Sequence, residues 1–256
     1  MHSIKLFFKI GFLLVVIVCS NCVFAQGPPI TVDKPIMLGK GSFLVRTLSE
    51  YRKTNQGTFV NTPLIGHYLP KSNLLLGVHL PIVYYNSEIN FGDIDLLFKY
   101  QFLRKDQKGK TLRGVFKILQ TLPIGEELMQ MNISTGIYQS YQGFILGYES
   151  LKLGFTNELG GVLSESLFLN RLQHKMSVGI PFLKPNYPVK QINLFCETQS
   201  NWFLGLNQYN VLYAQGLQYA KGKWTFEIAY QFPVYQSNHF LHQRDYSLYI
   251  GSRIII

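Results

Sequence analysis

Residues 94–102 read IDLLFKYQF, and this stretch decides the fold. Every second side chain from Ile94 to Phe102 is apolar, whereas Asp93, Asp95 and Lys99 belong to the intervening row. Side chains alternate between the two faces of a β-strand, so a period of two residues predicts a strand with one apolar face and one charged face.

The same alternation recurs along most of the chain. Residues 74–84, 168–182 and 224–232 show it clearly, and weaker versions bring the number of candidate strands to twelve. The candidates are 43–51, 64–69, 74–84, 94–102, 112–122, 144–148, 151–159, 168–182, 192–202, 211–219, 224–232 and 246–256. Most approach the roughly 9 to 11 residues with which a tilted strand crosses a bilayer. Because 64–69 and 144–148 are short, ten strands is an alternative.

The apolar faces could be covered by lipid or by a second protein layer. A soluble β-protein also alternates apolar and polar residues. Lipid is favoured because aromatic residues such as Tyr84, Trp202 and Trp224 fall near strand ends, where membrane barrels carry aromatic girdles. The polar faces are also rich in Gly, Thr, Asn and Gln, as a lumen is. We therefore expect residues 41–256 to form an all-β, transmembrane, antiparallel up-and-down β-barrel.

The N-terminus has the pattern of an export signal. Lys5 and Lys9 precede an apolar run, and small residues follow before Gln26, so residues 1–25 are predicted to be a secretory signal peptide. A membrane anchor is less favoured because the run is short, and a lipoprotein signal because Val18 and Asn21 precede the two early cysteines. Residues 26–40 are expected to be a periplasmic lead-in, with no plug in the first forty residues.

The chain is basic and cysteine-poor. The formal net charge of +10 falls to +8 when the two lysines of the signal are removed, which leaves 231 residues. An exported basic protein meets anionic lipid and lipopolysaccharide rather than nucleic acid. Cys196 is the one cysteine beyond the signal, so no disulfide within the mature chain is expected.

The connections differ in length in the manner of an outer-membrane barrel. Short turns at 70–73, 104–111, 183–190 and 221–223 are predicted to face the periplasm, with both termini. Longer loops at 86–90, 123–136 and 233–245 are predicted to face the outside. The expected location is the outer membrane of a Gram-negative cell.

Three short motifs resemble one family of barrels. The run from Gly92 to Tyr100, then Leu122-Pro123-Ile124-Gly125 and Ser134-Thr135-Gly136, is similar to the outer-membrane proteins associated with the meta-cleavage pathway of phenol degradation. The resemblance covers residues 74–163 best and implies a transporter of aromatic or other hydrophobic small molecules. The family's usual final aromatic residue is absent, because this chain ends in three isoleucines. Independently of the family, Pro123 and Gly125 are suited to ending a strand at the rim.

The residues predicted to line the lumen are those on the polar faces, together with two aromatic side chains. Opposite charges across a narrow lumen are expected to form a ladder of ion pairs rather than an acid pair for catalysis. The candidates are His79, Asp93, Asp95, Lys99, Lys117, Tyr141, Lys152, Glu158, Arg171, Lys175, Phe195, Glu197 and Glu227, with Glu149 as a further acid of the ladder.

No motif predicts an enzyme, a cofactor or a metal site. His239 and His242 are a close pair, but they are interpreted as loop residues because no cysteine and only Asp245 lies near them. No phosphate-binding loop or Cys-x-x-Cys pair is present in the sequence.

The function predicted is passive passage of small hydrophobic or aromatic molecules through a narrow barrel. The expected partners are outer-membrane lipid and lipopolysaccharide, a small-molecule solute and the barrel-insertion machinery, and no nucleic acid. Two alternatives stay open: a closed barrel that serves as a structural or surface-binding protein, and a lipid-modifying barrel enzyme.

Overall fold

The computed structural model describes residues 30–35, 37–55, 57–85, 87–125, 134–183, 190–237 and 243–256. The predicted signal peptide, the first part of the predicted lead-in, and His239 and His242 lie outside the described residues.

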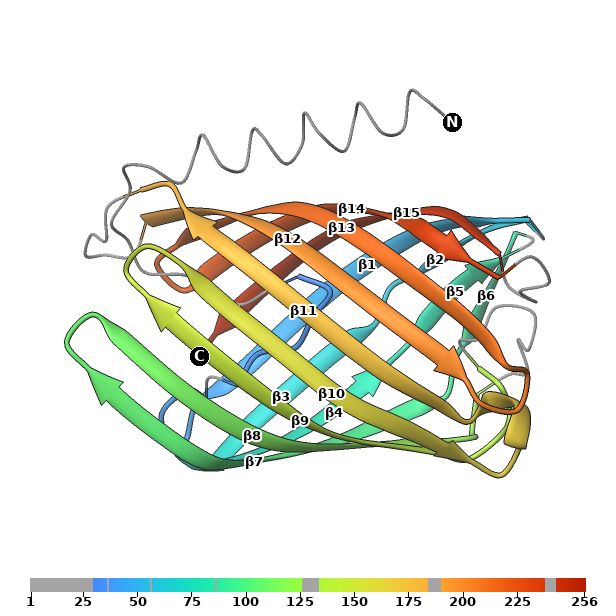
Figure 1. Cartoon of the computed structure of the whole chain (residues 1–256), viewed down its shortest axis with the longest axis horizontal. Coiled ribbons are helices and arrows are strands. Elements are labelled where there is room, and N and C mark those ends of the chain that lie inside the picture. Colours follow the sequence, from blue (N-terminus) through green and yellow to red (C-terminus); the bar gives the residue numbers. More distant parts are fainter. Residues whose placement is uncertain are drawn as a thin grey trace.

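The described chain forms a single antiparallel sheet that closes into a barrel (Figure 1). Sequential strands are neighbours, and the last strand pairs with the first, from Leu44 opposite Ile255 to Thr54 opposite Arg244. The strands are β1 (Phe43–Thr54), β2 (Gly57–Asn61), β3 (Leu64–Lys71), β4 (Leu74–Leu80), β5 (Ile82–Tyr85), β6 (Glu88–Phe91), β7 (Ile94–Gln107), β8 (Lys110–Leu122), β9 (Gln139–Ser150), β10 (Gly154–Ser164), β11 (Arg171–Pro181), β12 (Lys190–Phe203), β13 (Gln208–Lys221), β14 (Trp224–Gln236) and β15 (Arg244–Ile255). A 3-10 helix, Leu167–Leu169, lies between β10 and β11.

Twelve of these strands make the closed wall, in the order β1, β3, β4, β7 and then β8 to β15. The short strands β2, β5 and β6 extend β3, β4 and β7 beyond breaks at Thr62-Pro63, Pro81 and Gly92-Asp93. Proline has no amide donor, so it interrupts the hydrogen-bond ladder where it falls. The prediction of an all-β, twelve-stranded antiparallel barrel is confirmed. The loops predicted at 86–90 and 233–245 are shorter in the structure, because β6 and β14 continue into these ranges.

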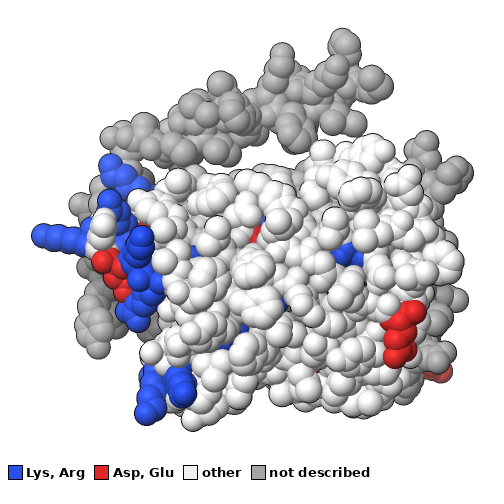
Figure 2. Space-filling model, turned by 60° about the horizontal axis from the view of Figure 1, so that its bottom comes forward, with Lys and Arg blue, Asp and Glu red and all other residues white. Residues whose placement is uncertain are grey.

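The outer face of the wall is apolar. Phe226, Ile228 and Tyr230 on β14 are exposed, whereas Glu227 and Gln231, which alternate with them, are buried. On the face that Figure 2 shows, the surface between the two ends is largely without charged groups, and most of the visible Lys, Arg, Asp and Glu lie at the ends. A side chain that is apolar and uncovered in the folded barrel is suited to lipid. None of the described helices is long and apolar enough to cross a membrane.

The two ends of the barrel differ in their connections. One end, called the turn end, carries Phe43, the C-terminus and the connections at 72–73, 108–109, 151–153, 182–189 and 222–223. The other, called the loop end, carries the connections at 55–56, 86–87, 123–138, 165–170, 204–207 and 237–243. The connections group at the two ends as predicted from the sequence, although their lengths do not separate cleanly: the loop-end connections at 55–56 and 86–87 are as short as the turns. The seam is closed at the turn end by Phe43 N–H to Ile256 O at 3.1 Å and Ile256 N–H to Phe43 O at 2.8 Å.

Residues 30–35 and 37–38, called the lumen segment, lie inside the barrel. Ile30, Val32, Pro35 and Met37 are buried there. The expectation that the first forty residues hold no plug was wrong, and the described part of the predicted lead-in enters the lumen instead of staying outside. The sequence offers little indication of this position, because the segment is too short to show an alternating pattern. Its partners also lie on strands far along the chain.

Candidate functional site: the filled lumen

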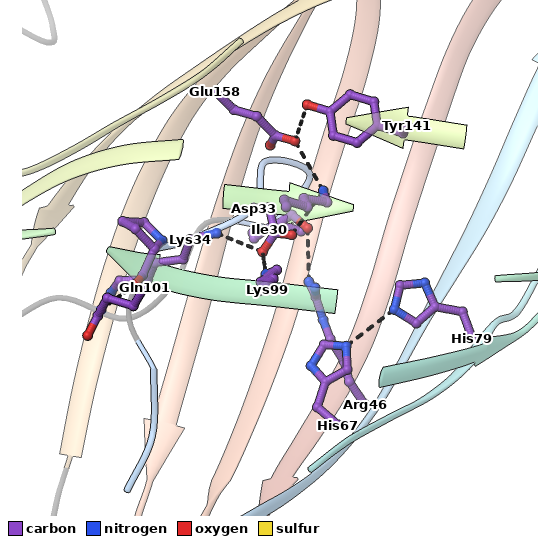
Figure 3. A network of polar contacts seen from close by, with 12 residues as sticks. Ile30, Asp33, Lys34, Arg46, His67, His79, Lys99, Gln101, Tyr141 and Glu158 are labelled. Carbon is purple, nitrogen blue, oxygen red and sulfur yellow. Dashed lines mark hydrogen bonds and ion pairs between the residues drawn. The ribbon is translucent and has the colours of Figure 1, made fainter. Parts of the chain in front are cut away.

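A buried network of charges joins the lumen segment to the wall (Figure 3). Asp33 forms ion pairs with Lys99 on β7 and with Lys117 on β8, the latter at 3.0 Å from Lys117 Nζ to Asp33 Oδ2. Lys117 also lies 3.1 Å from Oε1 of Glu158 on β10. The hydroxyl of Tyr141 donates to the same Glu158 oxygen at 2.6 Å. One carboxylate of the segment is therefore balanced by two ammonium groups of the wall, and a second carboxylate completes the network.

Glu197 on β12 holds the first two residues of the segment. Its carboxylate accepts the backbone N–H groups of Ile30 and Thr31, each at 2.7 Å, and also the Thr31 hydroxyl. Arg46 on β1 donates to the Ile30 carbonyl at 2.9 Å and to Glu227 at 2.8 Å. A carboxylate that accepts several donors is satisfied without a cationic partner. Glu197 is thus occupied in binding the segment.

Further contacts fix the segment nearer the turn end. Lys34 forms an ion pair with Glu149 on β9, and Gln101 Nε2 donates to the Pro35 carbonyl at 3.1 Å. The segment is absent from the strand pairings, and its polar contacts with the wall are made by side chains of β1, β7, β8, β9 and β12. It is attached to the wall without belonging to the sheet.

Apolar side chains of the segment fill two patches of the lumen wall. Ile30 packs with Phe195, Ala229 and Tyr249. Met37 packs in a second cluster formed by Leu69, Leu75, Leu97, Val115 and Ile145. Burying a side chain of this size contributes about 1.5–3 kcal/mol. The lumen is therefore lined by charges in one part and by apolar surface in another.

Glycines in the wall make room for the segment. A Cβ added at Gly216 would lie 2.5 Å from Ile30 Cδ1, and one at Gly147 would lie 2.4 Å from Pro35 Cγ. Any larger residue at these inward positions would collide with the segment. Some of the small residues predicted for the lumen wall therefore leave space for the lumen segment.

Two of the predicted lumen residues sit beside each other on β4 and β7. His79 Nε2 lies 3.2 Å from Nε2 of His67 on β3, and His79 Nδ1 lies 3.8 Å from Asp95 Oδ2. Asp95 Oδ1 accepts the Thr121 hydroxyl at 2.6 Å. Within the described ranges no three His, Cys, Asp or Glu side chains come together as a metal site would require.

Asp93 has a different role from Asp95. It is 2% exposed, and its two carboxylate oxygens accept the N–H groups of Gly125, at 3.2 Å, and Thr135, at 2.9 Å. A Cβ added at Gly125 would lie 2.3 Å from the carbonyl carbon of Gly92. The three motifs that carry the family resemblance therefore meet at one place at the loop end, where Asp93 ties both ends of the 126–133 connection to the wall.

Most of the remaining candidates line the lumen, with one exception. Lys99, Lys117, Tyr141, Glu158, Phe195, Glu197 and Glu227 are buried inside the barrel. Lys152 is wrong as a lumen residue: it is exposed in the turn between β9 and β10, because the strand predicted at 151–159 begins only at Gly154.

Arg171 and Lys175 on β11 are half-buried and rest on aromatic rings. The Arg171 guanidinium lies 5.6 Å from the ring of Phe203, and Lys175 Nζ lies 5.8 Å from that of Tyr141. Among the described residues no carboxylate forms an ion pair with either side chain. The predicted ion-pair ladder is therefore incomplete along β11.

Sequence reasoning missed a second charge network near the loop end. Glu50 on β1 binds Arg52 through both carboxylate oxygens, at 2.8 and 2.7 Å, and lies 3.7 Å from Arg244. The Tyr249 hydroxyl donates to Glu50 at 2.9 Å. The sequence does contain a pattern that could have indicated this network. Arg46, Glu50 and Arg52 are spaced by even numbers of residues and therefore share the inward face of the first strand. Asp33 and Lys34 had no such signal.

Comparisons with known proteins support the architecture. No protein-family model matches the sequence, and no curated protein matches it. Among solved structures, the COG4313 outer membrane channel from Pseudomonas putida F1 covers 90% of this chain and 100% of its own, with a TM-score of 0.61 and 11% identity. The NanC porin covers 82% and 98%, with a TM-score of 0.55 and 14% identity. The KdgM porin in complex with disordered oligogalacturonate covers 83% and 98%, with a TM-score of 0.51 and 10% identity.

At this level of identity the likeness concerns the fold. The chain has the fold of an outer-membrane β-barrel, and the similar structures of that fold are a channel and two porins. The lipid-suited outer face agrees with that location. The comparisons do not single out the phenol meta-cleavage family.

Proposed function

We propose that this protein is a narrow outer-membrane channel through which small solutes pass by diffusion, with the turn end toward the periplasm. The observation that carries the proposal is a lumen segment that is attached to the wall through side chains of the wall and is not part of the sheet. A segment fixed by ion pairs and hydrogen bonds can be displaced without breaking the sheet, whereas an additional strand could not. Passage then needs no energy-coupling step, only rearrangement of the lumen segment.

We further propose that the solutes are hydrophobic or aromatic. The lumen segment supports this because it places Ile30 and Met37 on apolar patches of the wall. Displacing the segment would uncover Phe195 and the leucine-rich patch, so an apolar solute could replace the contacts that are lost. The resemblance of the loop-end motifs to barrels associated with phenol degradation supports the same class.

A closed structural barrel is the second candidate, and the same segment favours it. Ile30 and Glu197 are buried and hydrogen-bonded to each other, and Asp33 is paired with Lys99 and Lys117, so the segment occupies the lumen as a permanent filling would. The two proposals differ in whether the lumen segment is ever displaced, and a measurement of solute flux distinguishes them.

The experiment is uptake and conductance of the reconstituted full chain. Proteoliposomes are given an aromatic solute and a sugar of similar mass, and single-channel currents are recorded in planar bilayers. We expect measurable conductance and faster entry of the aromatic solute. Conductance with equal rates would overturn the solute class but keep the channel. A correctly folded barrel, shown by its altered gel mobility without boiling, that carries neither current nor solute would favour the closed barrel.

A further inference from the structure

The exposed charges are distributed unequally between the two ends of the barrel. In the described part of the chain, the turn end carries one exposed acid, Asp106, and ten exposed cations: Lys40, Lys71, Arg104, Lys105, Lys108, Lys110, Lys152, Lys190, Lys221 and Lys223. The loop end carries one exposed cation, Lys53, and three exposed acids: Glu88, Glu165 and Asp245. On the face that Figure 2 shows, most of the visible Lys and Arg side chains lie at one end of the barrel.

The cations form a collar rather than a local patch. Each of the five turns of the turn end contributes or borders at least one of them, and Lys40 fills the place before β1. Asp106, the single exposed acid, is already paired with Arg104 at 2.6 Å and with Arg113 at 3.3 Å. The charge of the collar is therefore not balanced by the protein itself.

An aromatic side chain on the lipid face precedes or follows the cation on most hairpins. Phe43 follows Lys40 by three residues, Lys71 follows Tyr68 by three, Lys105 follows Phe102 by three, and Lys152 follows Tyr148 by four. Trp224, which is 50% exposed, adjoins Lys223 in the chain and lies opposite Lys221 across the hairpin. The pattern thus repeats around the barrel.

The spacing matches the depth of lipid head groups. Three residues of strand extend about 10 Å, and a tilt of about 35–45° reduces this to about 7–8 Å along the membrane normal. A bilayer of about 30 Å hydrocarbon and about 40–45 Å in all has a polar layer of about 5–8 Å on each side. When the aromatic rings lie at the edge of the hydrocarbon, the ammonium groups reach the level of the phosphates.

We propose that this collar binds anionic phospholipids, of the phosphatidylglycerol kind, in the leaflet at the turn end. The ammonium groups contact the phosphates, and the aromatic rings contact the upper acyl chains. The loop end, with its exposed acids, does not share this preference. The inference concerns the membrane around the barrel and does not depend on whether the lumen conducts.

The two tryptophans of the chain provide the test, because Trp224 lies at the collar and Trp202 lies at the loop end. The full chain is made with one tryptophan at a time, as W202F and W224F. Each is reconstituted into phosphatidylcholine vesicles that contain the same minor fraction of brominated phosphatidylglycerol or brominated phosphatidylcholine. Both leaflets have the same composition, so the orientation of insertion does not affect the comparison.

We expect the brominated anionic lipid to quench Trp224 about two- to fivefold more than the zwitterionic one, with high salt abolishing the difference. Trp202 should be quenched equally by both. Lys221→Gln with Lys223→Gln in the W202F background should remove most of the excess, whereas the matched control Lys53→Gln should leave it unchanged. Equal quenching of Trp224 by the two lipids, or the same excess at Trp202, would overturn the proposal; altered gel mobility without boiling verifies that each variant is folded.

Discussion

The ammonium group of Lys117 lies 3.0 Å from Oδ2 of Asp33 and thereby joins the barrel wall to the chain inside it. The same ammonium group contacts Glu158, so removing either carboxylate changes the environment of the other. The wall and the lumen segment are therefore one electrostatic unit, and perturbing a single residue of it should alter conduction.

Asp33→Asn should loosen the lumen segment. The variant loses the negative charge that balances Lys99 and Lys117, and the hydrogen bonds to those charged groups contribute about 1.5–3 kcal/mol each. We expect larger or more frequent single-channel openings and a modest fall in the free energy of unfolding in urea. Asp106→Asn, an exposed acid at the turn end, is the control and should leave the currents as they are. Unchanged currents in a folded Asp33→Asn barrel would show that Asp33 does not keep the segment in place.

Asp93→Ala should release the loop-end connection from the wall. The buried N–H group of Thr135 and the partly buried N–H group of Gly125 lose their acceptor, and leaving a buried donor unsatisfied costs about 1–3 kcal/mol. Amide hydrogen exchange at these two residues should become faster in the variant. Asp95→Ala is matched to it because Asp95 accepts from the Thr121 hydroxyl instead. Protection of Gly125 and Thr135 that survives in Asp93→Ala would contradict the assigned role.

Gly125→Ala should be among the least tolerated glycine substitutions. Its Cβ would lie 2.3 Å from the backbone of Gly92, which cannot yield as a flexible side chain would. We expect a reduced fraction of heat-modifiable barrel on a gel. Gly161→Ala is the control, since the nearest atom to its Cβ would be Leu172 Cδ2 at an ordinary 3.5 Å. Equal folded fractions for the two variants would argue against a close contact at Gly92.

Arg171→Gln combined with Lys175→Gln should shift the ion selectivity of the proposed channel toward cations. These two cations of β11 rest on aromatic rings and are not offset by a carboxylate in any of the ion pairs of the described ranges. In a salt gradient, the reversal potential of the double variant should shift toward that of a cation-preferring pore. Lys152→Gln, in the exposed turn, should leave the reversal potential unchanged. An identical shift in that control would mean that charge at the turn end, and not β11, sets the selectivity.

The wall was predictable because its information is local. The alternation of Ile94, Leu96 and Phe98 with polar residues follows directly from the pleat of a strand, and a closed barrel needs every strand to show it. The breaks at Pro63 and Pro81 were harder to place, since the period of two continues on both sides of them.

The contents of the lumen were not predictable in the same way. Asp33 meets Lys99 on β7 and Lys117 on β8 only inside the folded barrel, and nothing in the sequence around Asp33 indicates those partners. Lys117 and Glu158 were both expected in a ladder of opposite charges, with no partners assigned, because both belong to regular strands whose inward face can be recognised; in the structure they form an ion pair. The prediction for Lys152 was wrong for a related reason. The alternating pattern was extended into a turn, where side chains no longer alternate between the inner and outer faces of the wall.

The position of the lumen segment also bears on how the sheet acquires its curvature. The segment precedes β1, yet it contacts side chains of β7, β8, β9 and β12, so it offers an internal core around which successive hairpins can curl. If the lumen segment guides the curvature, weakening its contacts with the wall should slow closure of the barrel. The folded barrel can nevertheless remain almost as stable as the unaltered protein. The rate of barrel closure in detergent or lipid would then report on Asp33 and Glu197 more sensitively than the equilibrium does.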